Sequence, residues 1–328
     1  MANLRVCISV LNWNGADRTL ACLDALTHLD YPDRQILIVD NASTDDSVSR
    51  IAAAYPHLEM LCADSNGGYA AGNALALRRA LDSDADLFWI VNNDSRPAPD
   101  ALRALVDAYQ EYGAALYGSV SLDNGGAILL TTSWAMDAHG QPDYATLLYG
   151  KPLAECFPDG RAREVANLMG NSFLIPLDVV RQHGFMDTAF FLYWEETDYC
   201  YRLRRAGIRS YLVPSSRVYH GGGQAHKHDS RLKPVTTYYN VRNRLIWARR
   251  YLSRGAYLRL TAQNIGFTLL RYLAPFKRGR KALPVAWYAT RALWDGLRGV
   301  TGKTIAPEKY VEIQKLNREQ QSNREKLK

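Results

Sequence analysis

Four acidic side chains stand close together near the middle of this 328-residue chain, among aromatic residues: Asp187, Glu195, Glu196 and Asp198. The last three belong to a segment that we expect to open a helix. Crowding and poor solvation both raise the pKa of a carboxylate, and a carboxylate with a raised pKa is a competent general base. Acidic residues in the first turn also complement the helix dipole, so the cluster alone fits a structural role as well.

Three continuous apolar runs in the N-terminal half predict buried strands, at residues 6–11, 35–39 and 87–91. Helix-like stretches lie between them, at residues 16–29, 46–55 and 69–81. This alternation predicts an α/β fold with a mostly parallel sheet flanked by helices. Ligands of such sheets bind beyond the carboxyl ends of the strands.

Polar residues follow each of these runs. Asp40 and Asn41, after the second run, can accept from and donate to the edge of a base or a ribose. Asp94, after the third, suits a hard divalent cation held mostly by phosphate oxygens and water. A glycine-rich segment, Asn66–Asn73, opens a predicted helix, where a backbone can approach phosphates. Turns and helix caps use the same residue types, so each motif alone is weak evidence.

The order of the motifs resembles the family 2 glycosyltransferases with a GT-A fold. The motifs are NWNG, VDNASTD, NGGYAAGN, NNDS, GNSFLIP and WEETDYCYRLRRAG. The resemblance covers roughly residues 4–250. Within the family the chain looks most like bacterial rhamnosyltransferase-type enzymes of surface-polysaccharide assembly, such as those of O-antigen and cell wall.

The resemblance implies that the strand ends and the glycine-rich loop bind the nucleotide sugar. Asp40 looks like the acidic residue that contacts the nucleoside. The other residues implied at this site are Asn12, Asn14, Asn41, Asn66, Gly68, Tyr69, Asn73, Asn92 and Asn93. Asn92–Asp94 stands where the family has its D-x-D motif. Since Asn92 replaces the first acid, Asp94 is the expected carboxylate ligand of Mg²⁺ or Mn²⁺.

The same resemblance assigns the acidic cluster. Glu195 and Glu196 stand at the family's acidic pair, and by position Glu196 is the better candidate for the catalytic base, with Glu195 as the alternative. Asp198 is the third acidic candidate in this motif. It is more plausible in an ion pair with Arg202, one helical turn later.

A histidine is implied to complete the metal site. His220 lies in the segment VYHGGG, and a neutral imidazole suits this task. His226 and His228 are the alternates.

The implied reaction is an inverting displacement on a nucleotide diphosphate sugar. The expected donor is dTDP-L-rhamnose, with UDP-galactofuranose as the alternative. The expected acceptor is a hydroxyl of a lipid-linked glycan on a polyprenyl diphosphate.

The charge divides between two parts of the chain. Residues 1–230 hold 18 Lys/Arg and 28 Asp/Glu, whereas residues 231–328 hold 22 Lys/Arg and 5 Asp/Glu. Helices are expected from Tyr238 through Tyr251, at residues 256–274 and at residues 283–300, with Pro275 and a Lys/Arg run separating the last two. Apolar faces with aromatic rings and arginines are what a helix in a membrane interface needs. We therefore expect residues 238–300 to contact an anionic membrane surface, with packing on the catalytic body or in a dimer as the alternative.

These patterns predict a catalytic domain at residues 1–235, with nucleotide-sugar binding in about 1–120 and acceptor binding in about 121–235. A basic helical region follows at 236–328. The five cysteines are expected to be buried thiols in a reducing compartment. No signal peptide and no bilayer-spanning run is recognised, so a peripheral place on the cytoplasmic face of the inner membrane is expected.

Other functions explain less of the chain. The basic C-terminal part favours nucleic-acid binding, but the acidic cluster would repel phosphates. A sugar nucleotidyltransferase would carry Lys or Arg in its first glycine-rich loop, and residues 12–15 have none. A processive polysaccharide synthase would carry Q-x-x-R-W and spanning helices.

Overall fold

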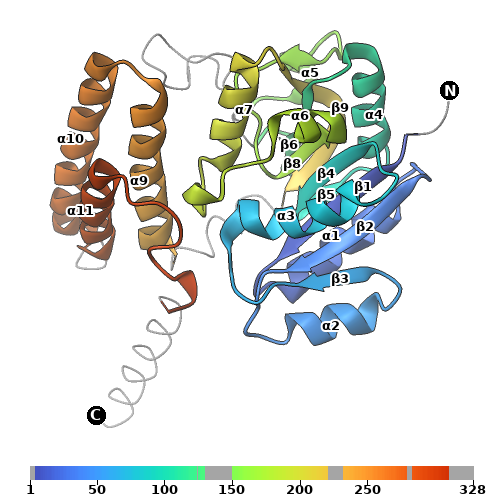
Figure 1. Ribbon diagram of the computed structural model, residues 1–328, viewed down its shortest axis with the longest axis horizontal. Helices are drawn as coiled ribbons and strands as arrows, with labels where there is room; N and C mark the ends of the chain where they lie inside the picture. The colour runs from blue at the N-terminus through green and yellow to red at the C-terminus, as the bar shows by residue number, and fades with distance from the viewer. Residues whose placement is uncertain (1–3, 124, 130–149, 221–231, 279–282, 310–328) are drawn as a thin grey trace. The chain divides into compact units, whose positions relative to one another are not determined.

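The computed structural model describes residues 4–123, 125–129, 150–220, 232–278 and 283–309 (Figure 1). The chain forms two compact units. Met1–Thr188 and Glu195–Gly223 make the first, which we call the sheet unit. Ala189–Trp194 and Gln224–Lys328 make the second, the helical unit. The chain thus enters the helical unit for the six residues directly before Glu195.

Within the described residues, nine strands form one mixed sheet in the sheet unit, in the order β3-β2-β1-β4-β8-β6-β9-β5 with β7 beside β9. The strands are β1 (Val6–Asn12), β2 (Arg34–Asp40), β3 (Glu59–Cys62), β4 (Leu87–Asn92), β5 (Ser95–Pro97), β6 (Leu116–Leu122), β7 (Arg163–Glu164), β8 (Ser172–Pro176) and β9 (Ser210–His220). The three predicted strands are present as β1, β2 and β4.

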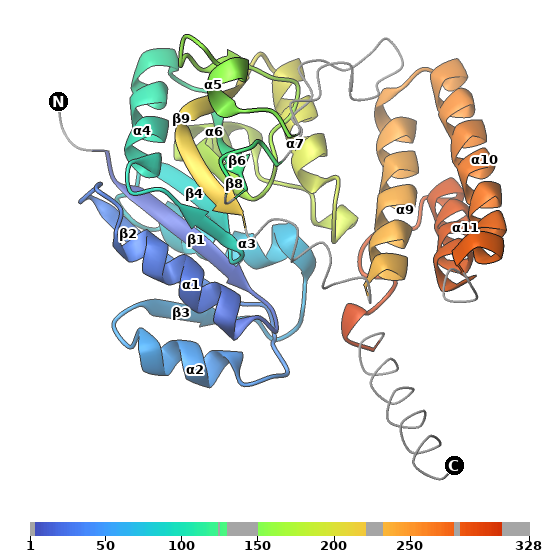
Figure 2. The same ribbon diagram turned by 180° about the vertical axis from the view of Figure 1, so that it is seen from behind.

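The first four strands in this order are parallel, as predicted (Figure 2). Asn12 pairs with Asp40, and Leu11 pairs with Asn92, so their polar ends meet at one edge. The other half adds antiparallel pairs, because β8 runs against β4 and β6, and β9 runs against β5 and β7.

Helices cover both faces of the sheet, which explains the continuous apolar strands. One face packs on α1 (Ala16–Thr27), α2 (Ser47–Ala54) and α4 (Ala101–Tyr112). The other packs on α3 (Gly68–Leu81), α6 (Leu177–His183) and α7 (Glu195–Arg205). Short α5 (Leu153–Cys156) and the 3₁₀ turn η2 (Thr188–Phe190) complete the described elements before the C-terminal part.

The helical unit contains α9 (Lys233–Tyr251), α10 (Arg254–Arg278) and α11 (Leu283–Arg298), which pack on one another. We expected Pro275 to end the second of these helices, and this was wrong. Helix α10 continues through Pro275 to Arg278, although a proline there cannot donate to the carbonyl four residues earlier. Among the described residues we find no helix with the length and hydrophobicity that a bilayer crossing requires.

The cysteines are free thiols, and Cys7, Cys22 and Cys200 are buried as expected. Cys62, at the end of edge strand β3, is exposed, so the expectation of burial was wrong for this residue.

Candidate active site

The carboxylate of Asp40 is fixed at the sheet edge by its neighbours. Asn12 Nδ2 donates to Asp40 Oδ1 (2.7 Å), and Ser43 donates from Oγ to the same oxygen (2.6 Å) and from its backbone N–H to Oδ2 (2.8 Å). Both Asn12 and Asp40 are buried. The side chain of Asn12, a predicted nucleotide contact, therefore already has protein partners, and it orients Asp40.

The glycine-rich loop is tied to the end of β2. Asn41 Nδ2 donates to Asn66 Oδ1 and to the carbonyl of Gly68, and the N–H of Gly67 donates to Asn41 Oδ1, each at 3.1 Å. Gly68 has φ +84°, a left-handed conformation that favours glycine. Asn73 is buried and bonds to Ser9 Oγ and the carbonyl of Tyr69. The amides of Asn41, Asn66 and Asn73 thus shape the loop that opens α3.

The remaining predicted nucleotide residues lie at the same edge. Asn14 is left-handed (φ +49°), and its Oδ1 accepts the N–H of Thr44 (2.7 Å). Asn93 Nδ2 donates to Thr19 Oγ1 (3.0 Å). The N–H of Asn92 donates to the carbonyl of Asn171, which precedes β8.

Strands β5 and β9 bring together the two predicted metal ligands. Ser95 pairs with His220, so Asp94 lies beside the end of β9. Asp94 Oδ1 is 3.5 Å from His220 Nε2. This buried oxygen accepts no hydrogen bond from the described residues. His226 and His228 lie outside the described residues.

The donor set at Asp94 fits a divalent cation that a substrate helps to hold. A carboxylate oxygen and an imidazole nitrogen are suitable ligands, and an enclosed oxygen without a hydrogen bond is open to a cation. The described part of the chain contains no cluster of three or more His, Cys, Asp or Glu side chains that could hold a metal. Two protein ligands would leave room for the oxygens of a diphosphate.

Three residues of the acidic cluster lie in the first turn of α7, as predicted: Glu195, Glu196 and Asp198. Asp198 is 1% exposed and lies 4.0 Å from Arg202 Nε, which confirms the predicted ion pair. Arg202 also donates to the carbonyls of His183 and Phe185. Asp198 therefore belongs to the contacts that fix α7 on the loop after α6.

Glu196 has the environment that a general base needs. Its Oε2 atom is enclosed and accepts no hydrogen bond from the described residues. Desolvation by burial raises the pKa of Glu196 to about 6. A carboxylate with this pKa is ionised near neutral pH and still basic enough to take a proton.

Tyr69 contacts the chain segment that also bonds to the residues around Asp94. Burial, followed by the charges of Glu196 and Glu195, raises the pKa of Tyr69 well above its ordinary value. The Tyr69 hydroxyl donates to the carbonyl of Gly170. The next residue, Asn171, accepts the N–H of Asn92 (3.0 Å) and the hydroxyl of Ser95 (3.4 Å) through its backbone carbonyl. Asn92 and Ser95 flank Asp94, so residues 170 and 171 connect Tyr69 to the segment that contains the predicted metal ligand Asp94.

Asn171 is a candidate site residue that sequence reasoning missed. It is 4% exposed, and its Nδ2 donates to Ser121 Oγ (2.6 Å), while Oδ1 accepts nothing from the described residues. The motif GNSFLIP contains this residue, and a signal was available: an asparagine directly before a buried strand.

Comparisons with known proteins bear on the family and on the fold. Residues 6–148 match the family described as "Glycosyl transferase family 2". Three relatives cover much of the chain. The low-salt glycan biosynthesis hexosyltransferase Agl10 of Haloferax volcanii is 22% identical over 84% of this chain and 85% of the relative. The N-acetylglucosaminyl-diphospho-decaprenol L-rhamnosyltransferase of Mycobacterium tuberculosis is 27% identical over 62% of this chain and 71% of the relative. The dTDP-rhamnosyl transferase RfbF of Shigella flexneri is 21% identical over 92% and 98%.

Solved structures share the fold. TarS 1-349 of S. aureus in complex with UDP-GlcNAc has a TM-score of 0.57 and 14% identity, over 90% of this chain and 82% of that one. The mannosyltransferase PcManGT of Pyrobaculum calidifontis in complex with GDP-Man and Mn²⁺ has a TM-score of 0.54 and 15% identity, over 90% and 88%. GalNAc-T7 with UDP, GalNAc and Mn²⁺ has a TM-score of 0.51 and 13% identity over 66% of this chain, which spans only 43% of that protein.

The sheet edge, the enclosed acidic residue and these similarities lead to one assignment. The relatives at low identity are hexosyl- and rhamnosyltransferases, and the structural neighbours are GT-A glycosyltransferases. The chain is a glycosyltransferase with the GT-A fold, and its residues 6–148 match the family 2 glycosyltransferases.

Proposed function

We propose that the protein transfers a sugar, with inversion, from a nucleotide diphosphate donor to a hydroxyl of a lipid-linked glycan. The observation that carries this proposal is the enclosed Oε2 atom of Glu196, in the same sheet unit that brings Asp94 to 3.5 Å from His220. A base and a cation site in one unit suit the two ends of a displacement, where one oxygen is deprotonated and another departs with negative charge.

The residues divide this work between them. Asp40 contacts the nucleoside, and Asn41 fixes the loop at Gly68, which approaches the diphosphate. Asp94 and His220 hold Mg²⁺ or Mn²⁺, which, when bound, acts as a Lewis acid that neutralises charge on the departing diphosphate. Glu196 takes the proton from the acceptor hydroxyl. Base catalysis of this kind contributes on the order of 10²–10⁴-fold.

The donor that we infer is dTDP-L-rhamnose. Support comes from two relatives, one named as a dTDP-rhamnosyl transferase and the other as an L-rhamnosyltransferase. The second acts, by its name, on a sugar carried on diphospho-decaprenol, which supports a polyprenyl diphosphate acceptor. Surface-polysaccharide assembly is therefore the process that we infer for this chain.

We further infer that the helical unit lies peripherally on a membrane. The inward face of α10 is mixed, because Thr261, Asn264 and Thr268 are buried together with Leu260. Its outer face is rich in apolar residues, with exposed side chains at Leu258, Ile265, Phe267, Leu269, Leu270 and Leu273. An exposed apolar surface of this kind suits a helix whose outer face meets lipid rather than water.

Aromatic rings with cations extend this surface on α11. Trp287 and Trp294 are more than half exposed, and guanidinium groups lie over both rings, from Arg291 and Arg298 at 5.9 and 5.7 Å. Such pairs suit the headgroup region of an anionic membrane.

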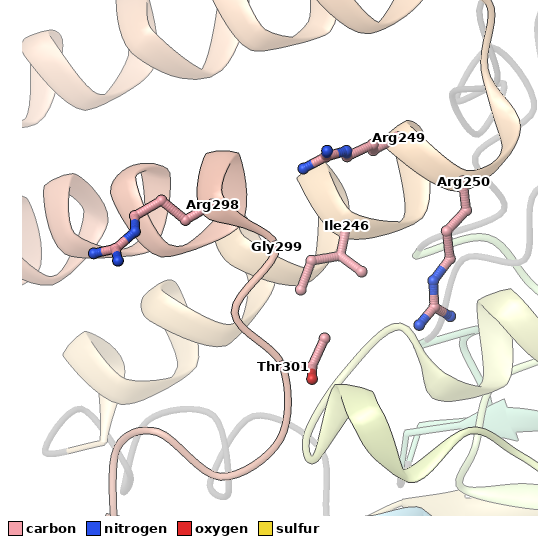
Figure 3. Close-up of a pocket in the computed structure, with 6 residues that line it drawn as sticks. All are labelled: Ile246, Arg249, Arg250, Arg298, Gly299 and Thr301. Carbon is pink, nitrogen blue, oxygen red and sulfur yellow. The ribbon is translucent and has the colours of Figure 1, made fainter.

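A basic hollow in the same unit fits phosphate. It encloses about 490 Å³ and is lined by Ile246, Arg249, Arg250, Arg298, Gly299 and Thr301. Figure 3 shows Ile246 and Thr301 facing the hollow with Arg249 and Arg250 at its rim, while Arg298 is turned aside. We infer that the two guanidinium groups at the rim take the phosphates of a lipid, since arginine suits phosphate recognition.

The test is hydrolysis and transfer with a panel of dTDP-, UDP- and GDP-sugars, with and without Mn²⁺, in the wild-type chain and the Glu196→Gln variant. We expect one donor to be used only with the metal. In Glu196→Gln, transfer should fall by 10²-fold or more, as loss of base catalysis requires. Donor binding, measured by calorimetry, should change by less than about twofold because Gln is nearly isosteric. Transfer at the wild-type rate in this variant would remove Glu196 from the mechanism.

A further inference from the structure

The segment directly before the acidic pair has an unfavourable backbone conformation. Phe191, Tyr193 and Trp194 all have positive φ, at +64°, +65° and +76°. None of them is glycine, and bulky L-residues seldom adopt this region. Residues 189–194 belong to the helical unit, whereas Glu195 begins α7 of the sheet unit. Something in the helical unit must therefore hold this segment in place.

Asn243 of α9 holds its backbone carbonyls. Nδ2 of this fully buried amide lies 2.9 Å from each of three oxygens, the carbonyls of Phe190, Leu192 and Tyr193. The NH2 group of Asn243 is thus close to three carbonyls within residues 190–193. These carbonyls converge on one point because the positive φ angles bend the backbone locally.

Arg242, the preceding residue, connects the segment to the end of the described chain. It is fully buried and donates to the carbonyl of Phe190 (3.0 Å), to Asn243 Oδ1 (2.9 Å), to the carbonyl of Gly302 (2.7 Å) and to Thr304 Oγ1 (2.8 Å). Its guanidinium carbon also lies 4.8 Å from the ring centroid of Tyr239. Burial of a charged arginine is costly unless its donors are bonded, and here neutral oxygens of the segment and of residues 302–304 accept from the guanidinium.

Side chains of the segment pack on the same helix. The ring of Phe191 lies 4.9 Å from that of Tyr239, and Trp194 lies 5.6 Å from Trp247. The carbonyl of Ala189 accepts the N–H of Gly302. The segment is thus held at both ends and in its middle, up to the residue before Glu195.

We propose that Arg242 and Asn243 are positioning residues for the catalytic base, because they fix the 189–194 segment that sets where α7 starts. This inference rests on the proposed role of Glu196. Arg242 and Asn243 themselves need not touch substrate, since they act through the backbone.

The test compares Asn243→Ala and Arg242→Lys with Leu245→Ala. Leu245 is fully buried on the same helix against Gly296 of α11, so its truncation weakens the helical unit without removing a bond to the segment. We expect kcat to fall at least tenfold in the first two variants, while the donor KM changes by less than twofold. The acidic limb of the pH profile, near 6 in the wild type, should move by half a unit or more. Leu245→Ala should keep the wild-type kcat and the wild-type acidic limb of the pH profile at temperatures where this variant is folded.

Deuterium exchange gives a second measurement that does not depend on activity. Amides of residues 190–198 should exchange at least tenfold faster in Asn243→Ala, and at the wild-type rate in Leu245→Ala. Unchanged exchange in Asn243→Ala, or equal losses of kcat in all three variants, would overturn the proposal. If the wild type transfers no sugar, the proposed function fails, and the exchange data still decide whether this segment is held by Asn243.

Discussion

At the scale of single residues, the same burial that makes Glu196 a base also weakens the fold. Its pKa of about 6 lies above the ordinary value of 4.5, so folding favours the protonated form. The stability that this gives is fully present below pH 4.5 and is lost as the pH rises through 6. Above that pH the ionised, enclosed carboxylate destabilises the fold by about 2 kcal/mol, because each unit of pKa corresponds to about 1.4 kcal/mol.

Glu196→Gln should therefore be more stable than the wild type at pH 8, by up to about 2 kcal/mol, and nearly equal to it at pH 4.5. Urea denaturation at the two pH values measures this. Glu155→Gln, at an exposed position of α5, is the matched control and should change stability at neither pH. An equal effect of Glu196→Gln at both pH values would contradict desolvation as the cause of the raised pKa.

Residue types alone predicted part of the site. A carboxylate after a buried strand pointed to Asp94, and the acidic first turn pointed to α7. The assignment of His220 required the resemblance, because nothing in VYHGGG shows that β9 pairs with β5. The enclosed atoms of Glu196 and Asn171 depend on burial, which follows from contacts between distant segments and so from the folded chain.

At the scale of elements, α3 closely approaches the chain before β8. Tyr69, in the first turn of α3, bonds to the carbonyl of Gly170, which is 101 residues later. A Cβ atom at Gly170 would lie 2.9 Å from the Tyr69 hydroxyl oxygen and 3.1 Å from Cζ. The glycine is required here by this approach, and its φ is not left-handed.

Gly170→Ala should displace the Tyr69 ring, destabilise the fold by roughly 1–3 kcal/mol, as overpacking does, and lower kcat. Thermal denaturation and steady-state kinetics measure the two effects. Gly255→Ala in α10, where an added Cβ meets nothing within 4 Å, should lose neither stability nor activity. If both glycine variants behave alike, the contact between Tyr69 and Gly170 does not position the site.

Apolar runs predicted β1, β2 and β4 to within one residue at each end, because strands covered on both faces are continuously apolar. The antiparallel half of the sheet escaped prediction, since its strands are short or interrupted by serines, as in β6 and β9. The segment 189–194 could not be predicted either. Its left-handed aromatic residues oppose local preference and depend on Arg242 and Asn243, about fifty positions later.

At the scale of the whole molecule, the C-terminal part of the chain is basic, and the exposed face of α10 adds an apolar surface to this part. Four leucines of this face, Leu258, Leu269, Leu270 and Leu273, are exposed by 58–65%. The sequence gives the composition of α10 but not which face packs inward, because both faces contain apolar residues. The structure of the helical unit supplies this information.

Replacing Leu269 and Leu273 together by Gln should weaken binding to phosphatidylglycerol vesicles at least about tenfold. Both leucines would be buried in lipid on binding, and losing the burial of two leucine side chains costs more than about 1.4 kcal/mol. Flotation with phosphatidylglycerol and with phosphatidylcholine vesicles measures this, and wild-type binding should be stronger to the anionic lipid. Gln263→Ala, an exposed position of the same helix, is the control. Unchanged flotation in the double variant, together with loss of a dimer in size-exclusion chromatography, would assign the surface to a second copy of the chain.

The chain crosses between its two units three times, after Thr188, Trp194 and Gly223. Recombination at a single point therefore cannot exchange the helical unit of one relative for that of another as an intact cassette. A chimaera joined near residue 224 would combine a foreign α9 with the native segment 189–194. The side chains of that α9 would then have to fit the contacts of this segment. Diversification of such enzymes by swapping C-terminal parts should be constrained accordingly, so that Phe191, Trp194 and their contacts on α9 change together.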